Sequence, residues 1–418
     1  MSVETITLGC RLNFAESETI RRLATADEEW VVVNSCAVTN EAVRQTRQAI
    51  RRLYRARPDA RILVTGCAAE LDPKAFETMP EVERVVGNSE KHHALAKPSF
   101  VLSEVEGRSE RPVPAPFHYT LSAPLRTNEV VPAGFLGHVR SFVAIQNGCD
   151  HRCTFCSIWQ ARGPSQSLPF EAIREAVERE LARGAKEIAL TGVDITSYDH
   201  EGMGLGLLCQ KLLAAIPSLS RLRLSSLDSI EIDEPLLELI AGEPRLMPHF
   251  HLSLQAGDDM ILKRMKRRHS RADAVKTVAR MKSARPDATI GADLIAGFPT
   301  ETEDMALNSL KLLDDCDIVA PHVFPFSPRP NTPAAHMPQL PPELVKARAA
   351  RLRAAAAERR KHWLDGLAGS TMDVMIENNG KGHSANFAPV RIEGTTRGEI
   401  GPARIIGRNG DHLTAVWA

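Results

Sequence analysis

The sequence has few aromatic residues, no excess charge of either sign and no long apolar run. Aromatic residues make up 5% of 418 positions, and 52 Lys and Arg balance 52 Asp and Glu. Zero net charge excludes a globally basic, histone-like binder, although it permits local basic patches. No stretch approaches the roughly 18 apolar residues of a transmembrane helix. The N-terminus also lacks the pattern of a secretory signal, so a cytoplasmic location is expected.

The sequence has only eight cysteines, a density far below that of disulfide scaffolds. In a reducing compartment, clustered cysteines indicate metal binding or catalysis. Cys209 and Cys316 lie inside apolar helical patterns and are expected in the core. The other six cysteines fall into two groups of three.

Strand-like and helical patterns divide the chain into three domains. Their alternation over residues 1–97 predicts an open parallel α/β domain. Residues 98–137 are rich in proline and predict a linker. Six further strand–helix units, followed by a long helix, predict a TIM-like (βα) barrel over residues 138–365. Short strands separated by Gly, Asn and Asp predict a small antiparallel β-barrel over 366–418. The expected fold class is therefore α/β with a small β-barrel.

The strongest motif is the C-x3-C-x2-C run of Cys149, Cys153 and Cys156. Three thiolates can ligate three irons of a cubane cluster and leave the fourth iron open to a small molecule. The run follows the first strand of the predicted barrel, so it is expected at the C-terminal mouth, where TIM-barrel active sites lie. A zinc site completed by His151 is the alternative.

The second group consists of Cys10, Cys36 and Cys67, each at the end of a predicted strand. In an open parallel sheet, ligands bind outside the carboxyl ends of the strands. The three thiols are therefore expected to converge on one sheet edge. Gly9 and Gly66 allow a tight turn just before two of them. The alternative is that each is an ordinary buried cysteine.

These motifs resemble those of the radical S-adenosylmethionine (SAM) methylthiotransferases over essentially the whole chain. The three-cysteine run with Phe155 before its last cysteine resembles the radical SAM signature. Residues 9–13 (GCRLN) and 16–18 (ESE) are similar to the family's opening motif. Residues 380–383 (GKGH), with Asn386 and Phe387, resemble its small RNA-binding barrel, a TRAM-like domain.

The resemblance implies two [4Fe–4S] clusters and SAM as cofactors. Cys149, Cys153 and Cys156 would hold the cluster that binds SAM, whose reductive cleavage gives a radical that abstracts hydrogen from carbon 2 of an adenine. Cys10, Cys36 and Cys67 would hold an auxiliary cluster that carries the sulfur to be methylated and inserted. An electron donor such as flavodoxin or ferredoxin is also implied, whereas no membrane partner is expected.

The resemblance also indicates the substrate, since the family has three branches. They act on isopentenyladenosine in tRNA, on an aspartate of a small-subunit ribosomal protein, and on N6-threonylcarbamoyladenosine at position 37 in the anticodon loop of tRNA. Residues 33–39 (VNSCAVT), 45–52, 190–195 and 223–227 are similar to the third branch. The other two branches remain alternatives, and a non-catalytic iron–sulfur or zinc RNA-binding protein is an alternative of another class.

Polar residues and glycines at the ends of other barrel strands are expected to form the SAM pocket. A glycine lets the backbone approach the ligand, and a carboxylate can accept hydrogen bonds from its ammonium group. An arginine after the cysteine loop could pair with the carboxylate of SAM. The candidates are Gly192, Asp194, Ser225, Ser226, Gln255, Gly297 and Arg162.

Three positions depart from the family pattern: Trp159 replaces a common proline, Ala256 a common serine and Asn331 a common glycine. Basic stripes could bind RNA phosphates: Arg44 to Arg55 at helical spacing, residues 263–271, and the helix over 343–363. The C-terminal barrel has balanced charge, so His383 and Phe387 are expected to contribute single-strand contacts.

Overall fold

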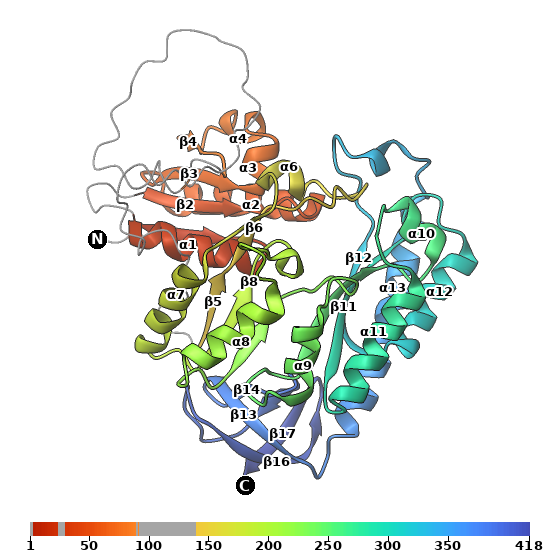
Figure 1. Ribbon diagram of the computed structural model, residues 1–418. Helices are drawn as coiled ribbons and strands as arrows, with labels where there is room; N and C mark the ends of the chain where they lie inside the picture. Colours follow the sequence, from red (N-terminus) through yellow and green to blue (C-terminus); the bar gives the residue numbers. More distant parts are fainter. Residues whose placement is uncertain (1–2, 24–29, 89–90, 92–138) are drawn as a thin grey trace.

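The computed structural model describes residues 3–23, 30–88, 91 and 139–418. The linker expected over 98–137 lies outside the described residues. Figure 1 shows three layers: the N-terminal sheet at the top, the (βα) units in the middle and the C-terminal β-barrel at the bottom. Among the helices of these described ranges, none is long and apolar enough to cross a membrane.

The N-terminal layer is a four-stranded parallel sheet in the order β1-β2-β3-β4. Branched apolar side chains of β2 and β3, such as Val33 and Val64, are fully buried beneath the helices, which explains why these short runs form central strands. The elements are β1 (Glu4–Thr7), α1 (Arg11–Leu23), β2 (Trp30–Ser35), α2 (Asn40–Ala56), β3 (Arg61–Gly66), α3 (Cys67–Leu71), α4 (Lys74–Glu77) and β4 (Arg84–Val85).

The middle layer contains six parallel strands in two sheets, β5-β8-β9 and β10-β11-β12. A parallel bridge between Leu227 and Leu252 links the sheets. Within the described residues, β5 and β12 are both edge strands, so the barrel is an open arc. The strands are β5 (Arg140–Ala144), β8 (Glu187–Thr191), β9 (Leu222–Leu224), β10 (His249–Gln255), β11 (Thr289–Ala296) and β12 (Ile318–Pro325).

Helices between these strands cover the outside of the arc (Figure 1). Their apolar faces and the strands form the largest core, which includes Cys209 and Cys316 as expected. The helices are α7 (Phe170–Ala182), α8 (Leu205–Ala215), α9 (Glu234–Gly242), α10 (Asp259–Arg264), α11 (Arg271–Ala284), α12 (Glu303–Asp315) and α13 (Pro342–Asp365), which packs on β12. A small antiparallel pair, β6 (Gln146–Asn147) and β7 (Gln166–Ser167), flanks α6 (Ile158–Arg162). Short 3-10 turns lie at Ile195–Ser197 and Pro333–His336.

The C-terminal layer is a closed barrel in the order β13-β14-β15-β17-β16. Four of its pairings are antiparallel, but β15 and β17 are parallel. The expectation of a purely antiparallel barrel is therefore wrong at this pair. Closure explains it, because five strands cannot alternate in direction all the way around a closed barrel, so one neighbouring pair must be parallel. The strands are β13 (Thr371–Asn378), β14 (Lys381–Ser384), β15 (Pro389–Arg391), β16 (Ile400–Asn409) and β17 (His412–Trp417).

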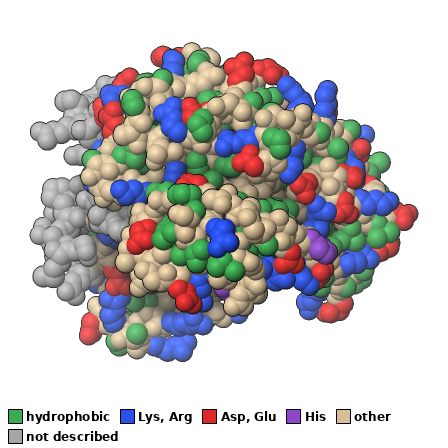
Figure 2. Space-filling view, turned by 90° about the horizontal axis from the view of Figure 1, so that it is seen from below, with side chains coloured by type: hydrophobic (Ala, Val, Ile, Leu, Met, Phe, Trp, Pro, Cys, Tyr) green, Lys and Arg blue, Asp and Glu red, His purple; other side chains and the backbone are tan. Residues whose placement is uncertain are grey.

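This small barrel closes the N-terminal end of the arc. The Oγ1 of Thr289, the first residue of β11, donates to the carbonyl of Asn386 at 2.7 Å. The Arg140 guanidinium, at the start of β5, pairs with Glu377 at 2.6 Å. Figure 2 views the molecule from below and shows basic and acidic side chains interspersed over this face. The N-terminal domain lies at the opposite, C-terminal end of the arc.

Candidate iron–sulfur and SAM site

Cys149, Cys153 and Cys156 lie on the loop that joins β6 to α6, at the C-terminal end of the arc. The amide of Cys149 donates to the Gly163 carbonyl at 3.1 Å, and that of Cys156 donates to Cys153 at 3.1 Å. The Cys156 thiol accepts a hydrogen bond from the Ile158 amide at 3.4 Å. Backbone contacts thus fix the loop that the sequence placed at the barrel mouth.

Cys153 of this loop is buried, and Cys149 and Cys156 are half-buried. Burial raises the pKa of Cys149 to about 12 and that of Cys156 to about 11. These thiols therefore carry protons that a metal must displace. The Arg267 guanidinium lies 3.6 Å from the Cys153 sulfur and also bonds Asp228 at 3.0 Å. Sequence reasoning assigned Arg267 only to a basic patch, because its partners lie far away in the chain.

Cys10, Cys36 and Cys67 follow the ends of β1, β2 and β3, which are neighbours in the sheet. The loops are packed tightly: a Cβ added at Gly9 would lie 2.6 Å from the Cys36 Cβ, and Gly9 has a φ of +99°. Gly66, with a φ of +95°, precedes Cys67 in the same manner. The structure thus places the three residues at one sheet edge, with Cys36 and Cys67 buried and Cys10 exposed.

Arg162 has a different environment from the one expected. Instead of pointing to a SAM carboxylate, its guanidinium bonds Glu16 at 2.8 Å and Asn13 at 2.7 Å, and its Nε lies 3.2 Å from the Cys67 sulfur. Glu16 also pairs with the buried Lys91 at 2.7 Å. Arg162 therefore belongs to the N-terminal cysteine group, which the chain order alone did not indicate.

The donor sets of both groups fit iron–sulfur clusters, since each provides three thiols and at least one nearby cationic hydrogen-bond donor. His151, which the zinc alternative requires, lies beside Cys149, and the ligand atoms of Cys149, His151 and Asp194 are all within 4.8 Å of one another. Its Nε2 pairs with Asp194 and lies 3.6 Å from Glu231. One cysteine and two carboxylates thus surround the imidazole, whereas the iron–sulfur assignment uses all three thiols of the loop.

The end of β8 is joined to the cysteine loop through Gln146, a residue that sequence reasoning missed. Its Oε1 accepts from the amides of Val193 and Asp194 at 3.0 and 2.9 Å, while its Nε2 donates to the Gly148 carbonyl at 2.8 Å. Gly192 makes this approach possible, because an added Cβ would lie 2.7 Å from the Gln146 carbonyl. Asp194 is thereby held beside Cys149, with 4.0 Å between carboxylate and sulfur.

The other expected pocket residues also end strands, but not all face open space. Ser225 is buried and Ser226 half-buried after β9. Gln255, with a φ of +69°, lines a cleft. The Gly297 amide instead donates to Glu301 at 3.0 Å, and this carboxylate pairs with Arg348 of α13 at 2.9 Å.

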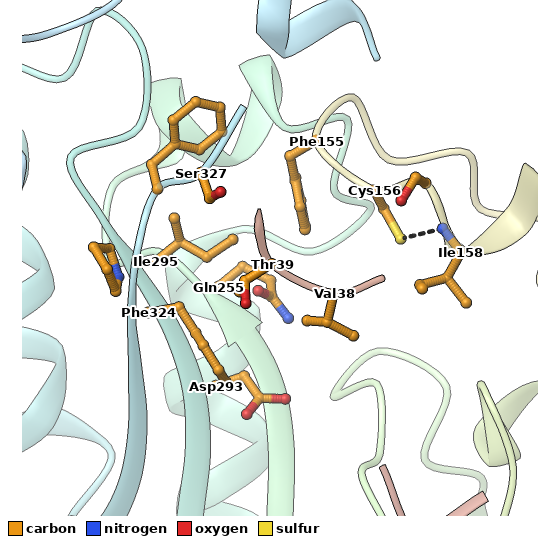
Figure 3. Close-up of a pocket in the computed structure, with 13 residues that line it drawn as sticks. Val38, Thr39, Phe155, Cys156, Ile158, Gln255, Asp293, Ile295, Phe324 and Ser327 are labelled. Carbon is orange, nitrogen blue, oxygen red and sulfur yellow. Dashed lines mark hydrogen bonds between the residues drawn. The ribbon is translucent and has the colours of Figure 1, made fainter. Parts of the chain in front are cut away.

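A cleft of about 180 Å³, partly open to solvent, lies between the domains. Figure 3 shows Phe155, Cys156 and Ile158 on one side, Gln255, Asp293, Ile295 and Phe324 on another, and Val38 and Thr39 between them. Asp293 was not predicted. Burial alone would raise its pKa, but hydrogen bonds from His251 and His322 lower it, so this carboxylate is ionised. The cleft thus combines aromatic walls with a few polar groups.

Two of the three departures from the family pattern, Trp159 and Ala256, have local explanations. The Arg152 guanidinium lies over the Trp159 ring, 4.9 Å from the ring centroid. Ala256 is buried in a small apolar cluster with Ile261 and Phe298. Neither residue is among those that line the cleft.

Most of the expected RNA-binding residues have protein partners. His383 and Phe387 stack on each other with ring centroids 4.5 Å apart, and Phe387 stacks on His249. The expectation that they bind single-stranded RNA is therefore not supported, because they join the two barrels. Three arginines of α13 are also engaged by acidic residues: Arg348, Arg351 and Arg359. Lys263 and Lys266 remain exposed beside the cysteine loop, where Thr154 donates to Met265.

Family models match the two domains that carry the cysteines. Residues 143–313 match the radical SAM superfamily, and residues 2–87 match a family described as Uncharacterized protein family UPF0004. Among solved structures, the radical SAM methyltransferase TsrM from Kitasatospora setae gives a TM-score of 0.53 at 17% identity, over 77% of this chain and 66% of TsrM. The match spans slightly less than two thirds of TsrM, and it shows the fold alone.

Curated relatives are more similar. A threonylcarbamoyladenosine tRNA methylthiotransferase MtaB from Rickettsia prowazekii is 41% identical over 99% of this chain and 97% of its own length. The protein of that name from Aquifex aeolicus is 32% identical over 94% and 97%. A tRNA-2-methylthio-N(6)-dimethylallyladenosine synthase from Cereibacter sphaeroides is 31% identical over 94% and 93%. The chain therefore belongs to the radical SAM methylthiotransferase family.

Proposed function

We propose that this protein attaches a methylthio group to carbon 2 of N6-threonylcarbamoyladenosine in tRNA. The identity of 41% to a relative named for that reaction supports this substrate. The observation that carries the proposal is the cleft, whose walls include Cys156 of one cysteine group and Val38 and Thr39, which closely follow Cys36 of the other. A base bound there is close to both groups.

Cys149, Cys153 and Cys156 would hold the cluster that binds SAM, and Cys10, Cys36 and Cys67 the auxiliary cluster. The first [4Fe–4S] cluster would pass the electron that cleaves SAM, and the auxiliary [4Fe–4S] cluster would provide the site from which sulfur is transferred. A flavodoxin or ferredoxin is the proposed electron donor.

The strand ends next to the cysteine loop would orient SAM. Asp194 accepts hydrogen bonds from its ammonium group, while Gly192 leaves room for the backbone to approach it. Gln255 borders the cleft with its amide, whereas Ser225, Ser226 and Gly297 position the neighbouring strand ends. Phe155, Phe324 and Phe326 would enclose the adenine base and exclude water from it.

The RNA backbone needs cationic contacts outside the cleft. Lys263 and Lys266 are exposed next to the cysteine loop and are suited to bind phosphates of the anticodon loop. The C-terminal TRAM-like barrel would bind RNA through another face, because His383 and Phe387 are stacked against the central domain.

The test is mass spectrometry of digested bulk tRNA from cells with and without the gene. We expect the 2-methylthio form of threonylcarbamoyladenosine to disappear without the gene and its unmethylthiolated precursor to accumulate. Complementation with the wild type and with Cys209→Ala should restore the modification, since Cys209 is a buried core residue. Cys67→Ala and Cys153→Ala should not.

The second candidate substrate is the dimethylallyl form of adenosine, which is supported by the 31% identity to the Cereibacter sphaeroides enzyme. Loss of only the methylthio-dimethylallyl nucleoside would favour this substrate. If neither nucleoside changes, the proposed tRNA function is wrong and the ribosomal-protein branch is the next candidate.

A further inference from the structure

The short helix α6 connects the two cysteine groups. Its first residue, Ile158, donates its amide to the sulfur of Cys156 at 3.4 Å. Its last residue, Arg162, directs its Nε to the sulfur of Cys67 at 3.2 Å. A single helix of five residues thus contacts one cysteine of each group.

The Arg162 guanidinium is held rigidly, with a side chain that is 1% exposed. Its two terminal nitrogens bond Glu16 at 2.8 and 3.1 Å, Asn147 at 2.9 Å and Asn13 at 2.7 Å. The Nε–H is therefore the donor that remains for the thiol. The hydrogen bonds of the two terminal nitrogens fix the guanidinium, so that its Nε–H is directed at the Cys67 sulfur.

The charged group beside this contact is the Arg162 guanidinium. Arg162 and Lys91 both pair with Glu16, so two buried basic side chains share one buried carboxylate. Burial lowers the pKa of Lys91, whereas Arg162 stays charged and directs its Nε–H at Cys67. A buried cation stabilises nearby negative charge strongly, because the surroundings screen it poorly.

We propose that Arg162 is a positioning residue that raises the reduction potential of the auxiliary cluster by donating a hydrogen bond to the Cys67 thiolate. The inference rests on the proposed function, which assigns that cluster to Cys10, Cys36 and Cys67. One-electron reduction converts [4Fe–4S]²⁺ to [4Fe–4S]⁺, so a positive donor at a ligand sulfur stabilises the reduced form. Glu16 acts in the opposite sense by neutralising part of the positive charge.

The test uses the full-length chain with Cys149, Cys153 and Cys156 all changed to Ala, so that only the auxiliary cluster is loaded. Each variant is reconstituted anaerobically and titrated with dithionite while the electron paramagnetic resonance signal of the reduced cluster is recorded. Arg162→Met should shift the midpoint potential to more negative values, and Arg162→Lys should shift it less. Glu16→Gln should shift it to more positive values. Gln160→Ala on the same helix is the matched control and should leave it unchanged.

Unchanged potentials in Arg162→Met and Glu16→Gln, with normal iron content, would overturn the inference while leaving the proposed function intact. If Arg162→Met binds too little iron to titrate, Arg162→Lys and Glu16→Gln decide: opposite shifts support the inference, and unchanged potentials refute it. A parent triple variant that binds no iron would refute the proposed cluster assignment and the inference together.

Discussion

Phe387 of the C-terminal barrel stacks on His249, the first residue of β10, with ring centroids 5.0 Å apart and an angle of 18° between the planes. The His383 ring also stacks on the Phe387 ring, with centroids 4.5 Å apart, and the Arg223 guanidinium lies 4.8 Å from the Phe387 ring centroid. An aromatic side chain of the C-terminal barrel thus packs against the N-terminal end of the central arc.

Replacing Phe387 by Ala should destabilise the whole chain rather than weaken RNA binding alone. The loss of stacked, half-buried aromatic area predicts a decrease of about 2 kcal/mol in the free energy of unfolding. Urea denaturation followed by tryptophan fluorescence measures it. Ile406→Ala, at a 58% exposed position of the same barrel, should stay within about 0.5 kcal/mol of the wild type. Equal effects of both changes would contradict the role of Phe387 at the interface.

Gly9→Ala should prevent loading of the auxiliary cluster. The new Cβ would lie 2.6 Å from the Cys36 Cβ at a φ of +99°, so the loop that carries Cys10 must move. Gly184→Ala is a matched control, because Gly184 has a φ of +98° but nothing within 4 Å of an added Cβ. Iron analysis after anaerobic reconstitution should show the loss of one cluster in Gly9→Ala only. Full iron content in that variant would argue against the assigned cysteine set.

Asp194→Asn should weaken SAM binding. The amide keeps the shape of the side chain but removes the charge that would meet the ammonium group, a loss of about tenfold or more in affinity. Equilibrium dialysis of labelled SAM against the reconstituted enzyme measures the dissociation constant. Asp199→Asn, an exposed carboxylate in the same segment, should bind SAM like the wild type. Unaltered affinity in Asp194→Asn would exclude the carboxylate from SAM recognition.

Glu187→Gln should strongly destabilise the cluster-free chain near neutral pH. This fully buried carboxylate pairs with Arg140, Arg221 and Arg223, and its loss leaves three cations without their shared partner. We expect a loss of about 3 kcal/mol or more. Glu178→Gln breaks a surface pair with Arg174 and should cost about 0.5 kcal/mol or less. Similar losses in the two variants would contradict this account of the buried pairs.

The same carboxylate predicts how stability depends on pH. Burial alone would raise the pKa of Glu187, but the three arginines lower it from 4.5 to about 2. Its contribution is therefore complete above pH 4.5 and is lost as the pH falls toward 2. The stability difference between the wild type and Glu187→Gln should shrink over that interval. A difference that stays constant down to pH 2 would show that the arginines do not hold the carboxylate ionised.

The strands and the placement of the cysteines followed from local patterns. Cys36 and Cys67 could be placed because parallel strands end at a common edge, a rule that needs only strand boundaries. Arg162 could not, since its partners Glu16 and Cys67 lie in another domain and no periodicity links them. Phe387 was misinterpreted for a related reason: an aromatic residue in a loop suits RNA as well as it suits a domain interface. The KGHS sequence of strand β14 has little strand propensity, so local patterns do not indicate this strand.

The contact between β5 and the C-terminal barrel also bears on synthesis of the chain. Arg140 pairs with Glu377, 237 positions later, and Thr289 bonds the carbonyl of Asn386, 97 positions later. A nascent chain on the ribosome therefore contains Arg140 and Thr289, at the N-terminal end of the arc, well before the barrel residues that cover them are translated. Chains that terminate early therefore leave this end of the arc uncovered, because they lack the barrel that supplies Glu377 and Asn386.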